Sequence, residues 1–115
     1  MDTLDRIKAQ IGGHELLLYM KGRLDIHNSG FFQQVAHILN LCQAKYAYVN
    51  VLENPDIRQT LPQYAQWPTF PQLYLNGELL GGCDIVTEMY ENGELLSALQ
   101  QAEVTAEKVA FEEGE

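Results

Sequence analysis

The clearest structural signal in this chain is the stretch Gln72-Leu73-Tyr74-Leu75-Asn76-Gly77-Glu78-Leu79-Leu80. Two apolar runs flank an Asn-Gly pair, and this pair favours a tight two-residue turn because both of its residues tolerate positive φ. The stretch therefore predicts an antiparallel hairpin with strands over 72–75 and 78–80.

Two earlier segments have the composition of strands. The run Leu16-Leu17-Leu18-Tyr19-Met20 is short and almost wholly apolar, which is typical of a central strand buried on both faces. Residues 46–51 alternate and are rich in aromatic and β-branched side chains. Because helical periodicity over 29–41 separates them, the two strands are predicted to be parallel and joined by a right-handed crossover.

Most of the remaining chain has apolar residues at helical spacing or residues typical of helix caps, which predicts helices there. The first predicted helix begins at Asp2 or Thr3 and is ended by Gly12-Gly13. Another begins at Asn54-Pro55, and Pro62 is expected to distort it or end it early. After the hairpin, Gly81-Gly82-Cys83-Asp84 leads into a helix that Asn92-Gly93 ends, and another helix follows over 94–102. The order α-β-α-β-α-β-β-α-α predicts an α/β protein with a four-stranded mixed sheet flanked by helices, which is a thioredoxin-like arrangement.

Length and charge limit the functions that this chain can have. Its 115 residues suit one domain, which we place at 1–103, followed by an acidic tail at 104–115 that is expected to fray or extend into solvent. The net charge of −9 opposes nonspecific binding to nucleic acid or anionic lipid. Neither a membrane-spanning run nor a signal peptide is present in the sequence, so we expect a soluble, cytoplasmic protein.

The cysteine count points to a reducing compartment. Cys42 and Cys83 are the only two, and they lie too far apart in sequence to suggest a metal cluster or a disulfide framework. Cys42 falls on the apolar face of a predicted helix and is expected to be a core residue.

Several motifs together resemble a monothiol glutaredoxin. They are Leu18-Tyr19-Met20-Lys21-Gly22, Tyr48-Val49-Asn50-Val51-Leu52, Asn54-Pro55-Asp56-Ile57-Arg58, Trp67-Pro68-Thr69-Phe70-Pro71-Gln72-Leu73-Tyr74 and Asn76-Gly77-Glu78-Leu79-Leu80-Gly81-Gly82-Cys83-Asp84-Ile85. The resemblance covers residues 1–101 and implies the thioredoxin-like fold already predicted from the order of elements.

The chain departs from this family at the active-site motif. Where the family has Cys-Gly-Phe-Ser, this chain has Ser29-Gly30-Phe31-Phe32, and His27 replaces a preceding proline. A cysteine at a helix N-terminus beside Lys21 would have a lowered pKa and act as nucleophile and iron ligand, whereas a serine hydroxyl stays protonated. Ser29 is suited to a helix N-cap. Natural divergence and a laboratory Cys-to-Ser exchange both remain open, and the changes at His27 and Phe32 favour divergence.

The glutathione site that the resemblance implies is present in full. Its residues are Lys21, Arg58, Thr69, Phe70, Pro71, Cys83 and Asp84. In the family the two cations pair with the glycyl carboxylate. A cis bond before Pro71 is expected, with the Phe70 backbone pairing with the ligand like an added strand. The start of the helix at Cys83 and Asp84 holds the γ-glutamyl end.

Simpler roles exist for each of these side chains. Lys21 and Arg58 are alternatively plain surface charges, Asp84 a helix cap, and Cys83 a small packing residue rather than a surrogate thiol.

By resemblance, the function is iron–sulfur cluster assembly or trafficking and thiol redox homeostasis. Intact members hold a [2Fe-2S] cluster between two protomers, using each active-site cysteine and two glutathiones, and they pass it to iron–sulfur assembly or recipient proteins. With Ser29 at the ligand and nucleophile position, this chain is expected to lack thiol transfer, and its ligation of a cluster is doubtful. The alternative is a non-catalytic binding or adaptor module with the glutaredoxin fold.

Overall fold

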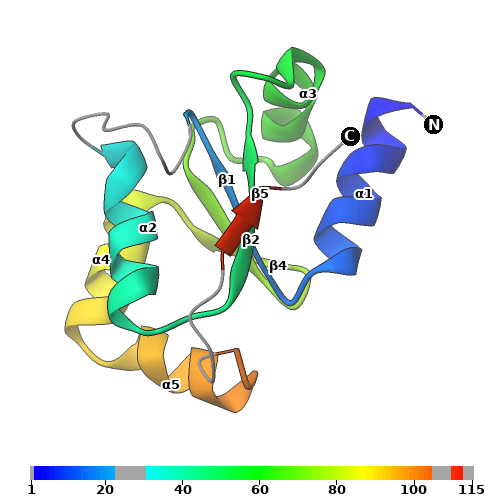
Figure 1. Cartoon of the computed structure of the whole chain (residues 1–115). Helices are drawn as coiled ribbons and strands as arrows, with labels where there is room; N and C mark the ends of the chain where they lie inside the picture. The colour runs from blue at the N-terminus through cyan, green and yellow to red at the C-terminus, as the bar shows by residue number, and fades with distance from the viewer. Residues whose placement is uncertain (1, 23–30, 105–109, 113–115) are drawn as a thin grey trace.

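The computed structural model describes residues 2–22, 31–104 and 110–112 (Figure 1). The helices and strands in chain order are α1 (Thr3–Gly13), β1 (Leu16–Met20), α2 (Phe31–Leu41), β2 (Tyr46–Asn50), α3 (Pro55–Ala65), β3 (Gln72–Leu75), β4 (Glu78–Gly81), α4 (Cys83–Glu91), α5 (Glu94–Gln101) and β5 (Ala110–Glu112).

The predicted four-stranded mixed sheet is confirmed in order β4-β3-β1-β2. β1 and β2 are parallel, with Leu18 opposite Tyr48, and β3 is antiparallel to both β1 and β4. The hairpin turn has positive φ at Asn76 (51°) and Gly77 (85°), as the Asn-Gly pair predicts. The hairpin therefore joins the parallel pair through β3.

The end of the chain differs from the prediction of a solvated tail. Residues 110–112 form β5, a fifth strand parallel to β2, with Ala110 opposite Tyr46. Val104 is buried, and its main-chain oxygen accepts a hydrogen bond from the N–H of Lys45. An open edge of β2 carries unpaired backbone donors and acceptors, and pairing with β5 satisfies part of them. The acidic composition of the segment did not indicate this pairing.

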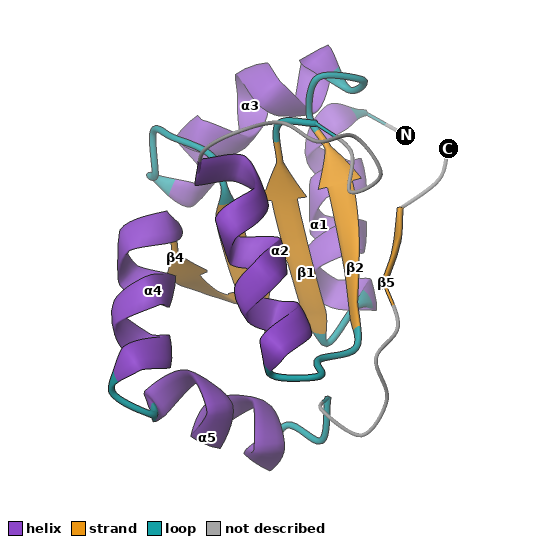
Figure 2. Ribbon diagram, turned by 60° about the vertical axis from the view of Figure 1, so that its left-hand side comes forward, coloured by secondary structure: helices purple, strands orange, loops and turns teal. Residues whose placement is uncertain are grey.

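Helices cover both faces of the sheet. Figures 1 and 2 show α1 and α3 against one face and α2 and α4 against the other, with α5 below α4. Because successive strand residues point to opposite faces, β1 contributes Leu16, Leu18 and Met20 to one buried cluster and Leu17 and Tyr19 to the other. This double burial accounts for the apolar run that marked β1 in the sequence.

Two helices show where local signals held and where one failed. Asp2 caps α1, since its side chain accepts a hydrogen bond of 2.8 Å from the N–H of Asp5. The expectation that Pro62 would distort or end α3 early was wrong about its length, because the helix continues to Ala65. Pro62 lies in the last turn, where its missing N–H costs one helical hydrogen bond and packing of Leu61 holds the segment.

α3 is also joined to α1 by polar side chains. Asp56 accepts hydrogen bonds from Arg6 at 2.7 Å and from Thr3 at 2.9 Å, and Arg6 also donates to Asn54 at 3.1 Å. The hydrogen bond from Thr3 is the largest cause of the lowered pKa of Asp56, with the charge of Arg6 acting in the same direction against partial burial. These contacts hold the first turn of the helix that carries Arg58.

Candidate functional site

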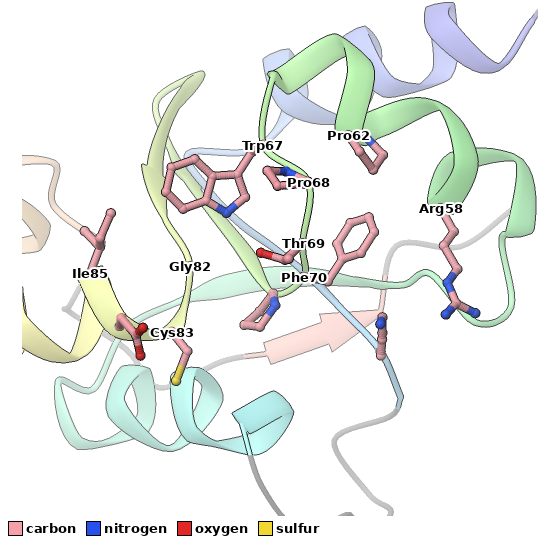
Figure 3. A pocket seen from close by; sticks show the side chains of 12 residues that line it. Arg58, Pro62, Trp67, Pro68, Thr69, Phe70, Gly82, Cys83 and Ile85 are labelled. Carbon is pink, nitrogen blue, oxygen red and sulfur yellow. The ribbon is translucent and has the colours of Figure 1, made fainter.

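One pocket of about 560 Å³ lies where the carboxyl end of β1, α3, the segment before β3 and the start of α4 meet. Figure 3 shows Arg58 on one side of the pocket, Cys83 on the other, and Thr69 and Phe70 between them. All seven residues that the resemblance assigned to glutathione line this pocket: Lys21, Arg58, Thr69, Phe70, Pro71, Cys83 and Asp84.

The cationic part of the pocket comes from two different elements. Lys21 follows β1 directly and is half-buried, whereas Arg58 lies in the second turn of α3 and is exposed. These are two of the seven basic residues in a chain with sixteen acidic ones. Two positive side chains in one pocket of an acidic protein favour binding of a carboxylate.

The middle of the pocket is the segment from Trp67 to Pro71. The Phe70–Pro71 peptide bond is cis, which confirms that prediction. Gln72 holds this segment in place. Its buried Nε2 donates hydrogen bonds to the main-chain oxygens of Trp67 at 3.0 Å and Thr69 at 3.2 Å. Gln72 was not among the predicted site residues, although a glutamine at the start of an otherwise apolar strand was the available signal.

A second side chain completes the partners of Gln72. The Oε1 of Gln72 accepts a hydrogen bond of 3.0 Å from the hydroxyl of Tyr74. Burial, together with the nearby Tyr64, raises the pKa of Tyr74 to about 12, so its hydroxyl stays protonated and can donate. Both ends of the Gln72 amide are therefore paired, which fixes its orientation beneath the pocket.

The far side of the pocket is the first turn of α4. The N-cap is Gly82, without a side-chain hydrogen bond, so Asp84 is within the first turn and is not the N-cap residue. A Cβ on Gly82 would lie 3.2 Å from the main-chain oxygen of Pro71 and 3.4 Å from Nε1 of Trp67. The glycine lets the start of α4 approach the Trp67–Pro71 segment this closely.

Part of the predicted active-site motif lies outside the described residues. His27, Ser29 and Gly30 lie there, and the backbones of Phe31 and Phe32 form the first turn of α2. Figure 2 shows this turn at the carboxyl end of β1. Lys21 is the residue directly after β1. Cys42 is buried in the core as predicted, and burial raises the pKa of its thiol.

Within the described ranges, no three His, Cys, Asp or Glu side chains are grouped closely enough to hold a metal ion. The same ranges contain no helix that is both long and apolar enough to cross a membrane.

Comparison with known proteins agrees with this fold. The sheet order, the helices on both faces and the pocket at the carboxyl end of β1 define a thioredoxin-like protein of the glutaredoxin type. Residues 16–80 match the glutaredoxin family. The chain belongs to the glutaredoxin family.

Relatives in sequence include proteins named Glutaredoxin 4. The one from Buchnera aphidicola subsp. Acyrthosiphon pisum is 55% identical over 95 residues, which cover 83% of this chain and 88% of that protein. The one from Escherichia coli (strain K12) is 50% identical over 111 residues, covering 96% and 94%. Among solved structures, reduced poplar apo GrxS14 is 46% identical with a TM-score of 0.72, covering 88% of this chain and 90% of that one.

Proposed function

We propose that this chain binds glutathione in the pocket between α3 and α4. The observation that carries the proposal is the convergence of all seven residues, from four separate segments of the chain, on one pocket. Lys21 and Arg58 supply positive charge for the glycyl carboxylate, and Asp84 supplies negative charge for the α-ammonium group of the γ-glutamyl end. The tripeptide carries these opposite charges at its two ends, as the pocket does.

The middle of the ligand would lie along the Trp67–Pro71 segment. We propose that the backbone of Phe70 pairs with the cysteinyl part of glutathione in the manner of an added strand. Thr69 and Pro71 flank this position in the pocket, and Gln72 holds the segment through its main-chain oxygens. A preformed segment loses little conformational entropy when the ligand binds.

We further propose that Ser29 occupies the position of the family's active-site cysteine and that the chain lacks thiol transfer of its own. A mixed disulfide with glutathione needs a thiolate that attacks sulfur, and a serine hydroxyl near neutral pH provides neither sulfur nor negative charge. The function of this chain would therefore depend on binding glutathione and not on thiol–disulfide exchange with it.

The residues of this chain do not fit the [2Fe-2S] cluster that the family resemblance implies. Iron in such clusters prefers thiolates, and the sequence offers only Cys42 and Cys83. Cys42 is buried in the core, and Cys83 lies in the pocket at the start of α4. The cluster-bridged homodimer of the family is therefore proposed only for a variant with cysteine at position 29.

The setting that we propose is the cytoplasm, among proteins of iron–sulfur assembly and thiol homeostasis. The loss of the thiol at position 29 favours a second candidate there, a non-catalytic adaptor that binds an iron–sulfur assembly or recipient protein through its glutaredoxin fold. Saturable glutathione binding supports the first function, and its absence leaves the adaptor.

Titration with reduced glutathione tests the proposal. We expect saturable binding at millimolar ligand, by calorimetry or chemical-shift changes, with clear weakening in Arg58→Ala and Asp84→Ala. Lys8→Ala on α1 and Glu88→Ala on α4 are the matched controls, since each removes the same charge from an exposed position outside the pocket. Absence of saturable binding by the unmodified chain would overturn the proposed function.

A further inference from the structure

Asn50 is a buried polar residue that does not itself line the pocket. It is the last residue of β2, and only 3% of its surface is exposed. Its Oδ1 accepts two main-chain hydrogen bonds, from the N–H of Gly22 at 2.9 Å and from the N–H of Leu52 at 3.0 Å. One side-chain oxygen therefore joins the end of β1 to the turn that follows β2.

The first of these bonds fixes the backbone next to Lys21. Gly22 is buried and has a φ of +119°, a backbone conformation that residues other than glycine rarely adopt. Its N–H would be a buried donor without the oxygen of Asn50, and a buried unpaired N–H is costly. The bond therefore sets where β1 ends and where Lys21 enters the pocket.

Asn50 is also linked to Arg58 through its own main chain. The main-chain oxygen of Asn50 accepts a hydrogen bond of 2.9 Å from Nδ2 of Asn54, the N-cap residue of α3. The main-chain oxygen of Asn54 in turn accepts a bond of 3.0 Å from the N–H of Arg58. Lys21 and Arg58 are thus each connected to Asn50 by one short path.

We propose that Asn50 is a positioning residue that sets the separation of Lys21 and Arg58 for recognition of a carboxylate. The inference rests on the proposed glutathione site and names the residue that arranges its cationic end. Two cations bind one carboxylate well only when their spacing matches it, so a small displacement of Lys21 weakens the pair more than the loss of one remote hydrogen bond would.

The central test is the dissociation constant for reduced glutathione in Asn50→Ala, measured by titration. We expect affinity to fall roughly fivefold, on the scale of a hydrogen bond's net contribution. Asn50→Asp keeps an oxygen for both N–H groups but adds a negative charge near Lys21 that opposes a carboxylate ligand, so it serves in amide exchange and not in the comparison of affinities. Gln10→Leu is the control, because it removes another buried acceptor, that of the Tyr19 hydroxyl, on a residue outside the pocket.

A double-mutant cycle separates positioning from a general loss of stability. If Asn50 acts through Lys21, Asn50→Ala weakens binding little further when Lys21→Ala is already present. Amide exchange gives a second measurement, in which Gly22 and Leu52 lose protection in Asn50→Ala and keep it in Asn50→Asp. If Asn50→Ala does not fold, Asn50→Ser, whose hydroxyl is too short to reach both N–H groups, replaces it.

The outcomes distinguish this inference from the proposed function. Unchanged affinity in Asn50→Ala, or equal losses in both backgrounds of the cycle, overturns the positioning role alone. Absence of binding by the unmodified chain overturns the proposed function and the inference with it.

Discussion

The side-chain Nε2 of Gln72 lies 3.0 Å from the main-chain oxygen of Trp67. Gln72 begins β3 and is fully buried, whereas Trp67 begins the segment that forms the middle of the pocket. A rigid strand therefore holds the backbone of a binding segment through a side-chain amide. Sites supported in this way keep their geometry because the supporting residue is itself fixed by packing.

Replacement of Gln72 tests this support. Gln72→Ala removes both donors to the segment, and we expect weaker glutathione binding together with a loss of about 1–3 kcal/mol in the free energy of unfolding. Denaturant unfolding and ligand titration measure the two effects. Tyr74→Phe is the control, because it removes the partner of Oε1 and leaves both bonds to the segment. Equal losses of affinity in the two variants would contradict a supporting role.

Reconstitution with iron, sulfide and glutathione tests the proposal that a chain with Ser29 does not hold a stable iron–sulfur cluster. We expect little or no stable visible absorption from the unmodified chain, since a hydroxyl ligates iron less well than a thiolate. The measurement is the absorption spectrum with iron and sulfide quantified per chain. A stoichiometric [2Fe-2S] spectrum would refute this expectation, and its loss in Cys83→Ser would then identify Cys83 as a ligand.

Restoring the sulfur tests whether the site is otherwise intact. Ser29→Cys is expected to form a mixed disulfide with oxidised glutathione and to assemble a glutathione-dependent cluster in a dimer, because the family resemblance implies that position 29 is the active-site cysteine position at a helix N-terminus, where the pKa of a thiol is lowered. Mass spectrometry, visible absorption and elution volume are the measurements.

Phe32 is the residue most able to obstruct this rescue, since the family has serine there. Ser29→Cys is therefore also made together with Phe32→Ser, with Phe32→Ser alone as the control that has no new thiol. If neither cysteine variant takes up glutathione or a cluster, the site differs from the family by more than one atom and the adaptor function gains support.

The contact between α1 and α3 predicts a dependence of stability on pH. The pKa of Asp56 is lowered from its ordinary value of 3.8, first by the hydrogen bond from Thr3 and then by the charge of Arg6. A lowered folded-state pKa means that the stabilisation is complete above the unfolded value and is lost as the pH falls through the folded value.

Asp56→Ala is expected to lower the free energy of unfolding at pH 7 by about 0.5–1 kcal/mol, because the ion pair is partly exposed and screened by solvent. The difference should disappear in acid, below the folded-state pKa. Denaturant unfolding at several pH values measures it, with Glu91→Ala as an exposed carboxylate outside this contact. A difference that persists unchanged in acid would show that charge is not its cause.

Local sequence signals predicted most of the fold. The Asn76-Gly77 pair specified the hairpin because both residues had to accept positive φ, and the structure has that turn. The apolar run over 16–20 indicated a strand covered on both sides, as the two core clusters show. Pro62 was the misleading signal, since tertiary packing carried α3 past a residue that disfavours helix.

The residues of the candidate pocket were available from sequence only through family motifs. Nothing in the spacing of Lys21, Arg58 and Asp84 places them together, because they belong to separate elements. The sheet order brings these elements to one end of β1, and the pocket follows from that order.

The hairpin turn, the five helices and the first four strands depended mainly on residues close in sequence, so local signals were enough to predict them. The strand β5 and the continuation of α3 past Pro62 were not predictable in this way. The hydrogen bonds of Gln72 to its pocket segment, of Asn50 to Gly22 and of β5 to β2 were decided by the tertiary structure. The side-chain amides of asparagine and glutamine can form hydrogen bonds with many different backbone groups. The edge of a strand can likewise pair with any segment that reaches it. Their partners therefore become specific only when folding excludes water and leaves one group within reach.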